Sequence, residues 1–406
     1  MALPLEGIRI IDCTIWQQGT YATALLADMG ADVIKVEGPD APDPGRALAT
    51  PGRPDHGLSA YFECHNRNKR GVVVDLKHPD GRGVLLRLVR TADVFVQNMR
   101  KGVMERLGLG YADLARENPA IIYASASGYG PEGPDATLPS MDIMGQARGG
   151  FVSVNGEPAR PVPAFAGMAD QVGAMLLANG ILVALVHRLR TGQGQEVDVS
   201  LLGSQVALQA FNITSYLFGG RVPQRRAREE AAPLWNTYQG RDGRWFVIGL
   251  AQGDRWWEGL CTAIGREDLR TDPRFADIRA RQANGAELVA ILDEVFAARP
   301  CEEWVRTLSE AGLMCAPVQD YAEVCADPQV RANGYVIPVE HPSGARVEMV
   351  GHPIRLSATP ATVRRMAPEF GEHTEEVLLE AGLTWEEITR LRESGAIGPR
   401  EARVGR

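Results

Sequence analysis

The sequence predicts an α/β protein built on a parallel sheet with helices on both faces. Three observations carry this prediction. Short apolar runs recur at residues 8–14, 31–39, 71–76, 93–99 and 120–130, segments with helical spacing lie between them at 20–30 and 80–92, and glycine or proline closes several of these segments. Strands that alternate with helices form parallel sheets, because each helix carries the chain back to the edge where the previous strand began.

The elements follow in a regular order. IRIIDCT (8–14) is a short β-like run, and the helix after it ends at Gly30, a residue suited to a helix C-terminus. ADVIKVEGP (31–39) is a second strand. GVVVDL (71–76), DGRGVLLRLVRTA (80–92) and DVFVQNM (93–99) repeat strand, helix and strand, and AIIYASASGYG (120–130) adds another strand. Ligands of such sheets bind beyond the carboxyl ends of the strands, which are residues 15–19, 37–39, 97–100 and 127–130.

The character of the chain changes after about residue 220. RVPQRRAREEAA (221–232) is charged and has no apolar periodicity, so it is typical of a linker. QGRDGRWFVIGL (239–250) predicts a turn with a strand, and 253–265 and 285–298 have the spacing of amphipathic helices. We expect this smaller region to form a separate lobe. Residues 312–320 predict a further strand, and 375–395 predict closing helices.

Composition and charge narrow the class of protein. The chain has 406 residues and a formal net charge of −8, which argues against a nucleic-acid or anionic-membrane partner. None of its six cysteines forms a CxxC pair, so we expect no metal. The N-terminal residues lack a signal-peptide pattern, and the apolar run at 174–186 is too short to span a bilayer. We therefore expect a cytoplasmic enzyme.

The loop after the first strand does not carry a dinucleotide fingerprint. It reads CTIWQQGTYA, with one glycine where a GxGxxG motif needs three. No GxxxxGK[ST] motif is present either. The sequence therefore gives little support to NAD or ATP as a ligand.

A lone carboxylate, Asp170, stands at the start of a long apolar helix pattern and is flanked by Gly167 and Gly173. An Asp at such a position commonly caps the helix by accepting bonds from its first N–H groups. The helix dipole also favours its ionised form, and an ionised carboxylate can act as a nucleophile. Capping and nucleophilic attack are compatible if one oxygen points outward, and both readings stay open at this stage.

Four basic residues, Arg67, Lys69, Arg70 and Lys77, surround the strand in NRNKRGVVVDLK (66–77). A charge cluster of this kind is usually a solvated surface. The alternative is a cationic patch for phosphate groups, which Arg and Lys bind through charge-assisted hydrogen bonds.

The order of motifs resembles CoA-transferase family III, which includes formyl-CoA transferase, carnitine CoA-transferase and α-methylacyl-CoA racemase. The resemblance runs over nearly the whole chain. It rests on PLEGIRIIDCT (4–14), LLADMGADVIKVEGP (25–39), NRNKRGVVVDLK, DVFVQNMRKGVMERLGLGY (93–111), NPAIIYASASGYGPEGP (118–134), MDIMGQARGG (141–150), HRLRTGQGQEVDVSL (187–201), CAPV (315–318) and GEHT (371–374).

The resemblance implies an enzyme and a site. Asp170 matches the family's catalytic carboxylate, which attacks an acyl-CoA and then carries CoA as an aspartyl thioester. A CoA thioester is the substrate, with a small carboxylic acid as the acceptor, and no metal or tightly bound cofactor is implied. The residues that match the family's CoA-binding segments are Gln17, Gln18, Val74, Asp75, Leu76, Lys77, Asn98, Met99, Arg100, Arg106, Leu138, Pro139, Ser140 and Met141.

The racemase branch remains the alternative within this family. Its members place a His before the Asp of the segment that reads MDIMGQ here, and this chain has Met141. Exchange of an α-proton needs two positioned acid–base groups, so the missing His favours the transferase. Arg148, Arg160 and Arg225 are candidates to pair with the far carboxylate of a dicarboxylic acid.

The resemblance also implies an architecture. A large Rossmann-like parallel-sheet domain, residues 1–200 and 331–406, would contain both termini. Residues 201–224 would be a linker, and residues 225–330 would form a small α+β domain with a return linker. Two such chains would form an interlocked homodimer.

Overall fold

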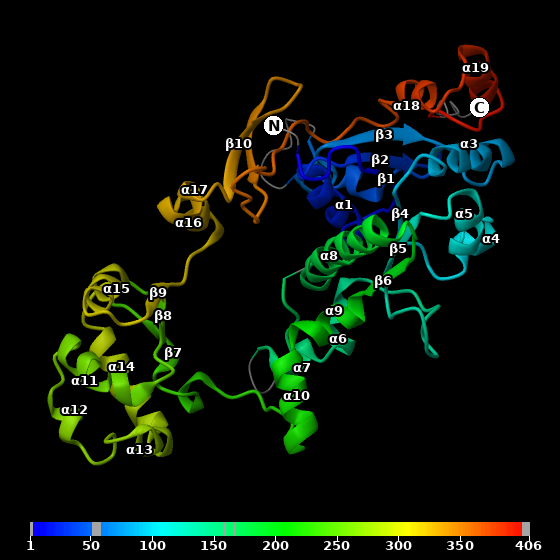
Figure 1. The fold of residues 1–406 in the computed structure, drawn as a ribbon. Coiled ribbons are helices and arrows are strands. Elements are labelled where there is room, and N and C mark those ends of the chain that lie inside the picture. The colour runs from blue at the N-terminus through cyan, green and yellow to red at the C-terminus, as the bar shows by residue number, and fades with distance from the viewer. Residues whose placement is uncertain (1–2, 51–57, 157–159, 166, 400–406) are drawn as a thin grey trace, which may run out of the picture. The chain divides into compact units, whose positions relative to one another are not determined.

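The computed structural model describes residues 3–50, 58–156, 160–165 and 167–399 (Figure 1). The chain divides into two compact units. The first comprises Met1–Ser153, Pro163–Arg221 and Arg331–Arg406, and the second comprises Val154–Val162 and Val222–Val330.

The first unit contains a six-stranded sheet in which every pair is parallel. The strand order is β3-β2-β1-β4-β5-β6, so the chain moves outward from β1 to β3 and then returns to the other side of β1 at β4. This reversal between β1 and β4 is the topological switch point, where the loops at the carboxyl ends diverge and leave a crevice. The strands are β1 (Arg9–Cys13), β2 (Asp32–Glu37), β3 (Lys69–Val73), β4 (Val94–Gln97), β5 (Ile122–Ser127) and β6 (Glu196–Ser200).

Alternating strand residues pack on opposite faces, as the two-residue period of a strand requires. Ile11 and Phe95 point into one core cluster, and their neighbours Ile10 and Val94 point into the other. Both faces are buried over most of the sheet, which explains why the strand sequences are mostly apolar. The parallel α/β fold expected from the alternation is therefore confirmed.

Helices cover each face of the sheet. The first face is covered by α3 (Pro79–Val89), α4 (Val103–Arg106), α5 (Tyr111–Glu117), α18 (Thr374–Glu380) and α19 (Trp385–Glu393). The second is covered by α1 (Gln18–Asp28) and α8 (Met168–Thr191). The remaining elements of this unit are α2 (Ala60–Asn66), α6 (Asp142–Arg148), α7 (Phe151–Val154), α9 (Leu201–Leu208), α10 (Ala210–Gly219), the 3-10 turn η1 (Pro44–Ala47) and the hairpin β10 (Val336–Glu340) and β11 (Arg346–Val350).

Helix α8 is longer than its apolar sequence run suggested. It has 24 residues and is long and apolar enough to cross a membrane by length and composition, so the expectation that it is too short was wrong. One face repeats small or apolar residues at helical spacing, including Ala174, Leu177 and Ile181, and packs against α1 and the sheet (Figure 1). The core helix of a soluble protein passes the same test of length and apolarity.

The C-terminal segment closes the free edge of β3. The Thr374 hydroxyl accepts a hydrogen bond from the Val73 N–H, and the Gly398 N–H donates to the Val73 carbonyl. The Asp75 N–H, just beyond the strand, donates to Ala396. Residues far apart in sequence therefore complete the edge strand.

The second unit has its own core around a three-stranded antiparallel sheet ordered β7-β8-β9. Its strands are β7 (Trp235–Gln239), β8 (Trp245–Gly249) and β9 (Cys315–Pro317). Its helices are α11 (Gly253–Ala263), α12 (Asp268–Thr271), α13 (Ile278–Ala283), α14 (Gly285–Phe296), α15 (Cys301–Glu310) and α16 (Tyr321–Ala326), with the turn η3 (Arg228–Glu230) before β7 and α17 (Pro328–Ala332) at the return to the first unit.

The segment expected to be a linker, residues 201–224, is mostly helical. Helices α9 and α10 occupy most of it and belong to the first unit, where α9 packs on α8 and α6. The hydroxyl of Ser200 caps α9 by accepting a hydrogen bond from the Gly203 N–H. The large unit therefore extends to Arg221 rather than to residue 200.

Candidate active site

A cleft opens at the switch point of the sheet. Its walls come from the loops that follow three neighbouring strands: Ile15 to Gln18 after β1, Asn98 to Lys101 after β4, and Ala126 to Gly128 at the end of β5. The segment before α6 and the first turn of α8, with Asp170, complete it. The position agrees with the general rule that parallel sheets bind ligands where the strand order reverses.

Most residues implied by the family resemblance meet in this cleft. Those that line it together with Asp170 are Gln17, Gln18, Asn98, Met99, Arg100, Leu138, Ser140 and Met141. Pro139 lies between two of these in sequence but is not itself part of the lining. The fold thus brings together residues as far apart in the chain as Gln17 and Asp170.

The remaining implied residues lie elsewhere. Arg106 is exposed at the end of α4 and does not line the cleft. Residues 74–77 follow β3, which is separated from β1 by β2. The Val74 side chain is fully buried in the apolar core and its N–H is bonded to Glu37, so this residue cannot touch a ligand in this conformation. Lys77 is exposed, and Asp75 and Leu76 are half-buried.

Asp170 is not the cap of α8. The N-cap position is held by Gly167, whose φ of 96° is readily adopted only by glycine, and Asp170 is the third helical residue. Another carboxylate serves as the cap: Oδ1 of Asp142 accepts hydrogen bonds from the N–H groups of Ala169 (2.6 Å) and Asp170 (3.1 Å). The Asp142 carboxylate is held in turn by the Gln146 amide, at 2.7 Å. The capping interpretation of Asp170 was therefore wrong.

This arrangement leaves the Asp170 carboxylate free to react. It accepts no hydrogen bond from any residue within the described ranges, and it lines the cleft. Burial, followed by the negative charge of Asp142, raises the pKa of Asp170 from 3.8 to about 7. The expectation that the helix dipole keeps this group ionised was thus incomplete. Asp142 already occupies the first N–H groups of the helix, and near pH 7 both forms of Asp170 are populated.

The two glycines that flank Asp170 make room for the loop after β1. A β-carbon at Gly167 would lie 2.5 Å from the Gln17 amide nitrogen, and one at Gly173 would lie 2.7 Å from that of Gln18. Real side chains do not approach this closely. The Gln17 and Gln18 amides therefore lie directly against the first turns of α8, and Gln18 is fixed there by a 2.9 Å hydrogen bond to the Val199 carbonyl.

The basic residues of the segment 66–70 form neither a solvated surface nor a phosphate site. Arg67 is fully buried and donates to both oxygens of Asp28, and Lys69 is fully buried against Asp12 at 2.8 Å. Arg70 pairs with Asp32 and with two glutamates of α18. Both readings of the cluster were therefore wrong for these three residues, because carboxylates on other elements neutralise them; those of Arg67 and Lys69 are buried, and those of Arg70 are partly exposed.

Of the arginines considered for a dicarboxylate, Arg148 does not line the cleft. Arg148 pairs with Asp135 at 2.7 Å and stacks on Tyr129. Arg160 and Arg225 belong to the second unit. The basic side chains that do line the cleft are Arg100 and Lys101, both exposed.

The cleft contains three further residues to which the sequence assigned no role: Trp16, Tyr61 and Asp142. Trp16 and Tyr61 line it beside Asp170, and burial followed by the charge of Asp170 raises the pKa of Tyr61 above its ordinary value. Asp142 was visible only as part of the MDIMGQ motif. No local pattern marks Trp16 or Tyr61, since a tryptophan in a loop and a tyrosine on a short helix are common in any protein.

The described residues include no group of three or more His, Cys, Asp or Glu side chains that could hold a metal ion. The chemistry available in the cleft is that of an acidic nucleophile with a raised pKa, two glutamine amides and two exposed cations.

The chain is similar to known proteins over almost its whole length. The family model described as CoA-transferase family III matches residues 5–374. A succinate–glutarate CoA-transferase of Agrobacterium fabrum is 36% identical over 384 residues, covering 93% of this chain and 95% of the relative. An acetyl-CoA:oxalate CoA-transferase of Acetobacter aceti is 36% identical, covering 87% and 89%.

Solved structures agree with these sequence matches. A CAIB/BAIF family protein from Brucella suis has a TM-score of 0.83 and 32% identity, covering 94% of this chain and all of that chain. A Mycobacterium tuberculosis protein has a TM-score of 0.81 and 34% identity, covering 92% and 99%. The similarity in sequence and in structure has one consequence: the chain belongs to CoA-transferase family III.

Proposed function

We propose that this protein moves CoA from an acyl-CoA donor to a small carboxylic acid, with Asp170 as the covalent carrier. The observation that carries the proposal is the free Asp170 carboxylate, which lines the switch-point cleft while Asp142 caps its helix. Relatives are named for succinate, glutarate and oxalate, which supports small carboxylic acids as the substrates of this protein.

The steps follow from a carboxylate nucleophile. Ionised Asp170 attacks the thioester carbonyl, the C–S bond breaks, and a mixed anhydride forms as CoA leaves as a thiolate. The thiolate attacks the aspartyl carbonyl of the anhydride, which releases the first acid and leaves an aspartyl-CoA thioester. The acceptor carboxylate attacks this thioester, and the returning thiolate attacks the new anhydride at the acceptor's carbonyl. This last attack forms the C–S bond of the product acyl-CoA and breaks the anhydride bond to Asp170, which returns to a free carboxylate.

The cleft residues have distinct parts in this scheme. Gln17 lies against the helix turn that carries Asp170, and its amide is the neighbouring donor for an oxyanion. Arg100 and Lys101 supply positive charge at the mouth for the phosphates of CoA. The apolar side chains of Leu138 and Met141, which also line the cleft, suit the less polar pantetheine arm.

The racemase alternative is disfavoured by what surrounds Asp170. Proton exchange at a carbon needs a second acid–base group on the other side of the substrate. Met141 cannot serve, and the oxygens of Asp142 are engaged by two backbone N–H groups and the Gln146 amide. Incorporation of deuterium at the α-carbon of an acyl-CoA, without any acceptor acid, would instead favour the racemase.

Trapping of the covalent intermediates tests the proposal. Incubation with an acyl-CoA and borohydride should modify Asp170, and mass spectrometry of peptides locates the change. Asp170→Ala should abolish both the modification and CoA transfer to a panel of carboxylic acids, while CoA still binds. Full transfer activity in Asp170→Ala excludes the mechanism.

We also propose that the protein forms a homodimer, interlocked as the resemblance implies, and acts in the cytoplasm. Large apolar side chains stand exposed on α8 and α10, including Leu189, Phe211 and Phe218 at 78%, 81% and 90% exposure. Exposed apolar faces of this kind are usually covered by a partner. Light scattering should give a dimer mass, and Phe211→Glu with Phe218→Glu should lower it; a wild-type monomer contradicts the proposal.

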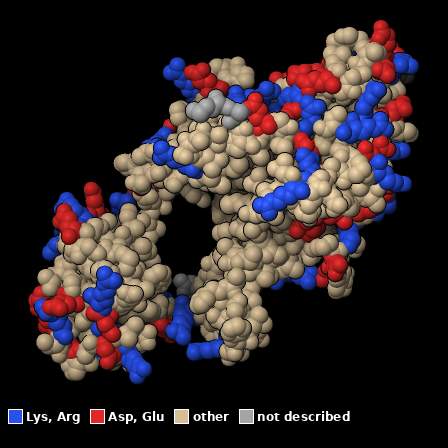
Figure 2. All heavy atoms as spheres, in the orientation of Figure 1, with Lys and Arg blue, Asp and Glu red and all other residues tan. Residues whose placement is uncertain are grey.

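Neither a nucleic acid nor a membrane is proposed as a partner. The net charge is −8, and Lys and Arg are interspersed with Asp and Glu over the face shown in Figure 2. A surface of mixed sign lacks the single-sign basic field that attracts phosphate backbones or anionic lipids.

A further inference from the structure

The loop between β1 and α1 holds an unusual backbone conformation beside the nucleophile. Trp16 has a φ of 64°, in the left-handed region that side chains with a β-carbon adopt only at a cost in free energy. The next residue, Gln17, lies against Gly167 at the first turn of α8. A conformation of this kind persists only where the surroundings over-determine it, and it is often found at functional sites.

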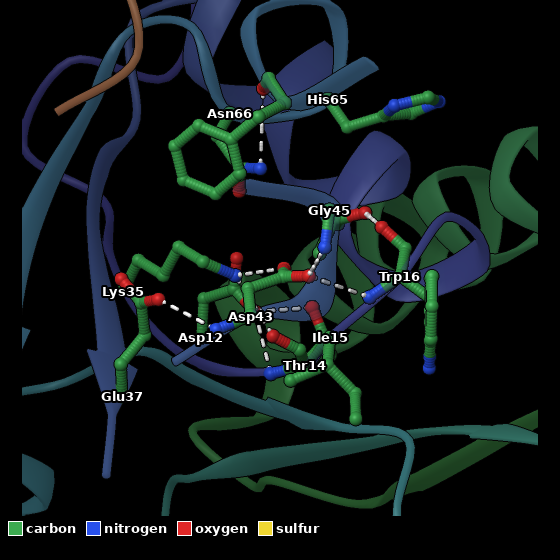
Figure 3. Close-up of polar contacts among 12 residues, drawn as sticks. Asp12, Thr14, Ile15, Trp16, Lys35, Glu37, Asp43, Gly45, His65 and Asn66 are labelled. Atoms are coloured by element: carbon green, nitrogen blue, oxygen red, sulfur yellow. Dashed lines mark hydrogen bonds and ion pairs between the residues drawn. The ribbon is translucent and has the colours of Figure 1, made fainter. Parts of the chain in front are cut away.

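A buried ion pair lies beneath this loop, as Figure 3 shows. Lys35 on β2 and Asp43 after it are almost fully buried, and their charged atoms are 2.8 Å apart. Lys35 also donates to the Thr14 carbonyl at 2.9 Å, and Asp43 Oδ1 accepts a hydrogen bond from the Trp16 N–H at 3.2 Å. The pair therefore binds the backbone on both sides of Ile15.

The carboxylate is itself held in place by a second set of contacts. Its segment folds back over β2 because the Asp43 N–H donates to Glu37, and Arg46 binds both oxygens of the same glutamate. Asp43 Oδ1 also accepts from the Gly45 N–H, at 2.9 Å. This rigid support is what a buried charge needs if it is to fix another part of the chain.

The opposite side of the loop faces the cleft. Neither Lys35 nor Asp43 lines the cleft, whereas Ile15, Trp16 and Gln17 all do. The pair itself lines no part of the cleft, and its hydrogen bonds reach the cleft wall through the loop that it holds.

We propose that Lys35 and Asp43 are positioning residues for acyl transfer: through the Thr14 carbonyl and the Trp16 N–H they hold the loop in its left-handed turn, so that Gln17 stays against the helix turn of Asp170. This inference rests on the proposed function, because it assigns a purpose to the loop in the acylation of Asp170. It predicts that loss of the hydrogen bond to Trp16 slows that step without weakening the binding of CoA.

Two matched double variants separate positioning from simple stability. Lys35→Met with Asp43→Asn and Lys35→Met with Asp43→Leu both remove the buried charges, and only the Asn side chain keeps an acceptor for the Trp16 N–H. We expect Asp170 acylation at saturating acyl-CoA to be about 10-fold slower or more in the Leu variant than in the Asn variant, because small misplacements of reacting groups are costly. The Kd of CoA should agree within about 2-fold, since the phosphate contacts are untouched.

The result that overturns the proposal is equal acylation rates in the two variants, whatever their melting temperatures. A purely structural pair lowers the melting temperature of the Leu variant and leaves the rate of the folded fraction unchanged. The wild-type protein is the reference for the proposed function: if it shows no acylation of Asp170, the transferase mechanism fails and the positioning role fails with it.

A second pair of variants leaves Lys35 and Asp43 intact. It therefore tests the proposal even if the double variants at these two positions do not fold. Trp16→Gly and Trp16→Ala both remove the indole ring, but only glycine adopts a φ near 64° without strain from a β-carbon. We expect Trp16→Gly to acylate Asp170 faster than Trp16→Ala. If Trp16→Ala acylates Asp170 as fast as Trp16→Gly or faster, the left-handed turn does not promote the reaction and the inference is overturned.

Discussion

Replacement of Asp142 by Asn should shift the pH dependence of the reaction toward acid. Asp170 attacks only as a carboxylate, so the acylation rate of the free enzyme rises with pH through the pKa of this group, about 7. Asp142 is the charge that raises this pKa, after burial. Asn removes the charge but keeps an oxygen that can accept the N–H bonds of Ala169 and Asp170.

The size of the shift follows from the two causes. Burial is the larger, so Asp142 accounts for less than half of the rise from 3.8 to about 7. We expect the midpoint in Asp142→Asn to fall by about one pH unit, an interaction between the two carboxylates on the order of 1 kcal/mol.

The assay is single-turnover formation of the aspartyl-CoA thioester, followed by intact-mass spectrometry after acid quench from about pH 5 to about pH 9. Asp142→Ala serves as the control, because it removes both the charge and the cap. Its midpoint should fall as well, and its maximal rate should drop because the first turn of α8 loses its acceptor. A midpoint that stays at wild-type pH or rises in Asp142→Asn would refute the assignment of Asp142 as the source of the shift.

Three further outcomes can be measured. Asp170→Asn should raise the melting temperature, with a gain that grows from about pH 4 to about pH 7 and is constant above. The reason is that the Asp170 carboxyl ionises in the unfolded chain at a lower pH than in the folded protein, so the wild type loses stability over this range. A gain that is largest at pH 4 contradicts this sign. Arg67→Met leaves Asp28 buried without its bidentate partner, so urea denaturation should show a loss of about 3–5 kcal/mol, and a loss below about 1 kcal/mol would show that the site relaxes or hydrates. Gly81→Ala and Gly83→Ala form a matched pair on α3: a β-carbon at Gly81 would lie 2.1 Å from the Asp75 carbonyl oxygen, whereas one at Gly83 meets nothing within 4 Å. We expect only Gly81→Ala to be destabilised. Its CoA affinity tests whether Asp75, Leu76 and Lys77, which do not line the cleft, contact CoA as the family resemblance implies; unchanged affinity in a destabilised Gly81→Ala would exclude them from the CoA site.

The sequence was sufficient to predict most of the sheet, because parallel strands buried on both faces are rich in apolar residues. The strand expected at residues 93–99 is β4 at Val94–Gln97, and the run at 31–39 is β2 at Asp32–Glu37. Strand β6 was missed as an element because EVDVS is short and half polar, and none of its residues is fully buried. The hairpin β10–β11 was missed because a proline interrupts its first strand.

The site was predictable in its nucleophile and in the loops around it, but not in its electrostatics. Asp142 meets the backbone of Asp170 across 28 residues, and no periodicity reveals such a contact. The same holds for Arg67 and Lys69, whose partners Asp28 and Asp12 come from other elements. The charges in the sequence suggested an exposed segment, whereas ion pairs with distant carboxylates place Arg67 and Lys69 in the interior.

The C-terminal segment that covers β3 has a consequence for synthesis of the chain. The Thr374 hydroxyl accepts a hydrogen bond from the Val73 N–H across 301 residues, so the outer strand stays open during synthesis until Thr374 has been made. An open strand invites pairing with other chains. Products that stop before this segment should therefore aggregate or be degraded rather than persist as partial enzymes.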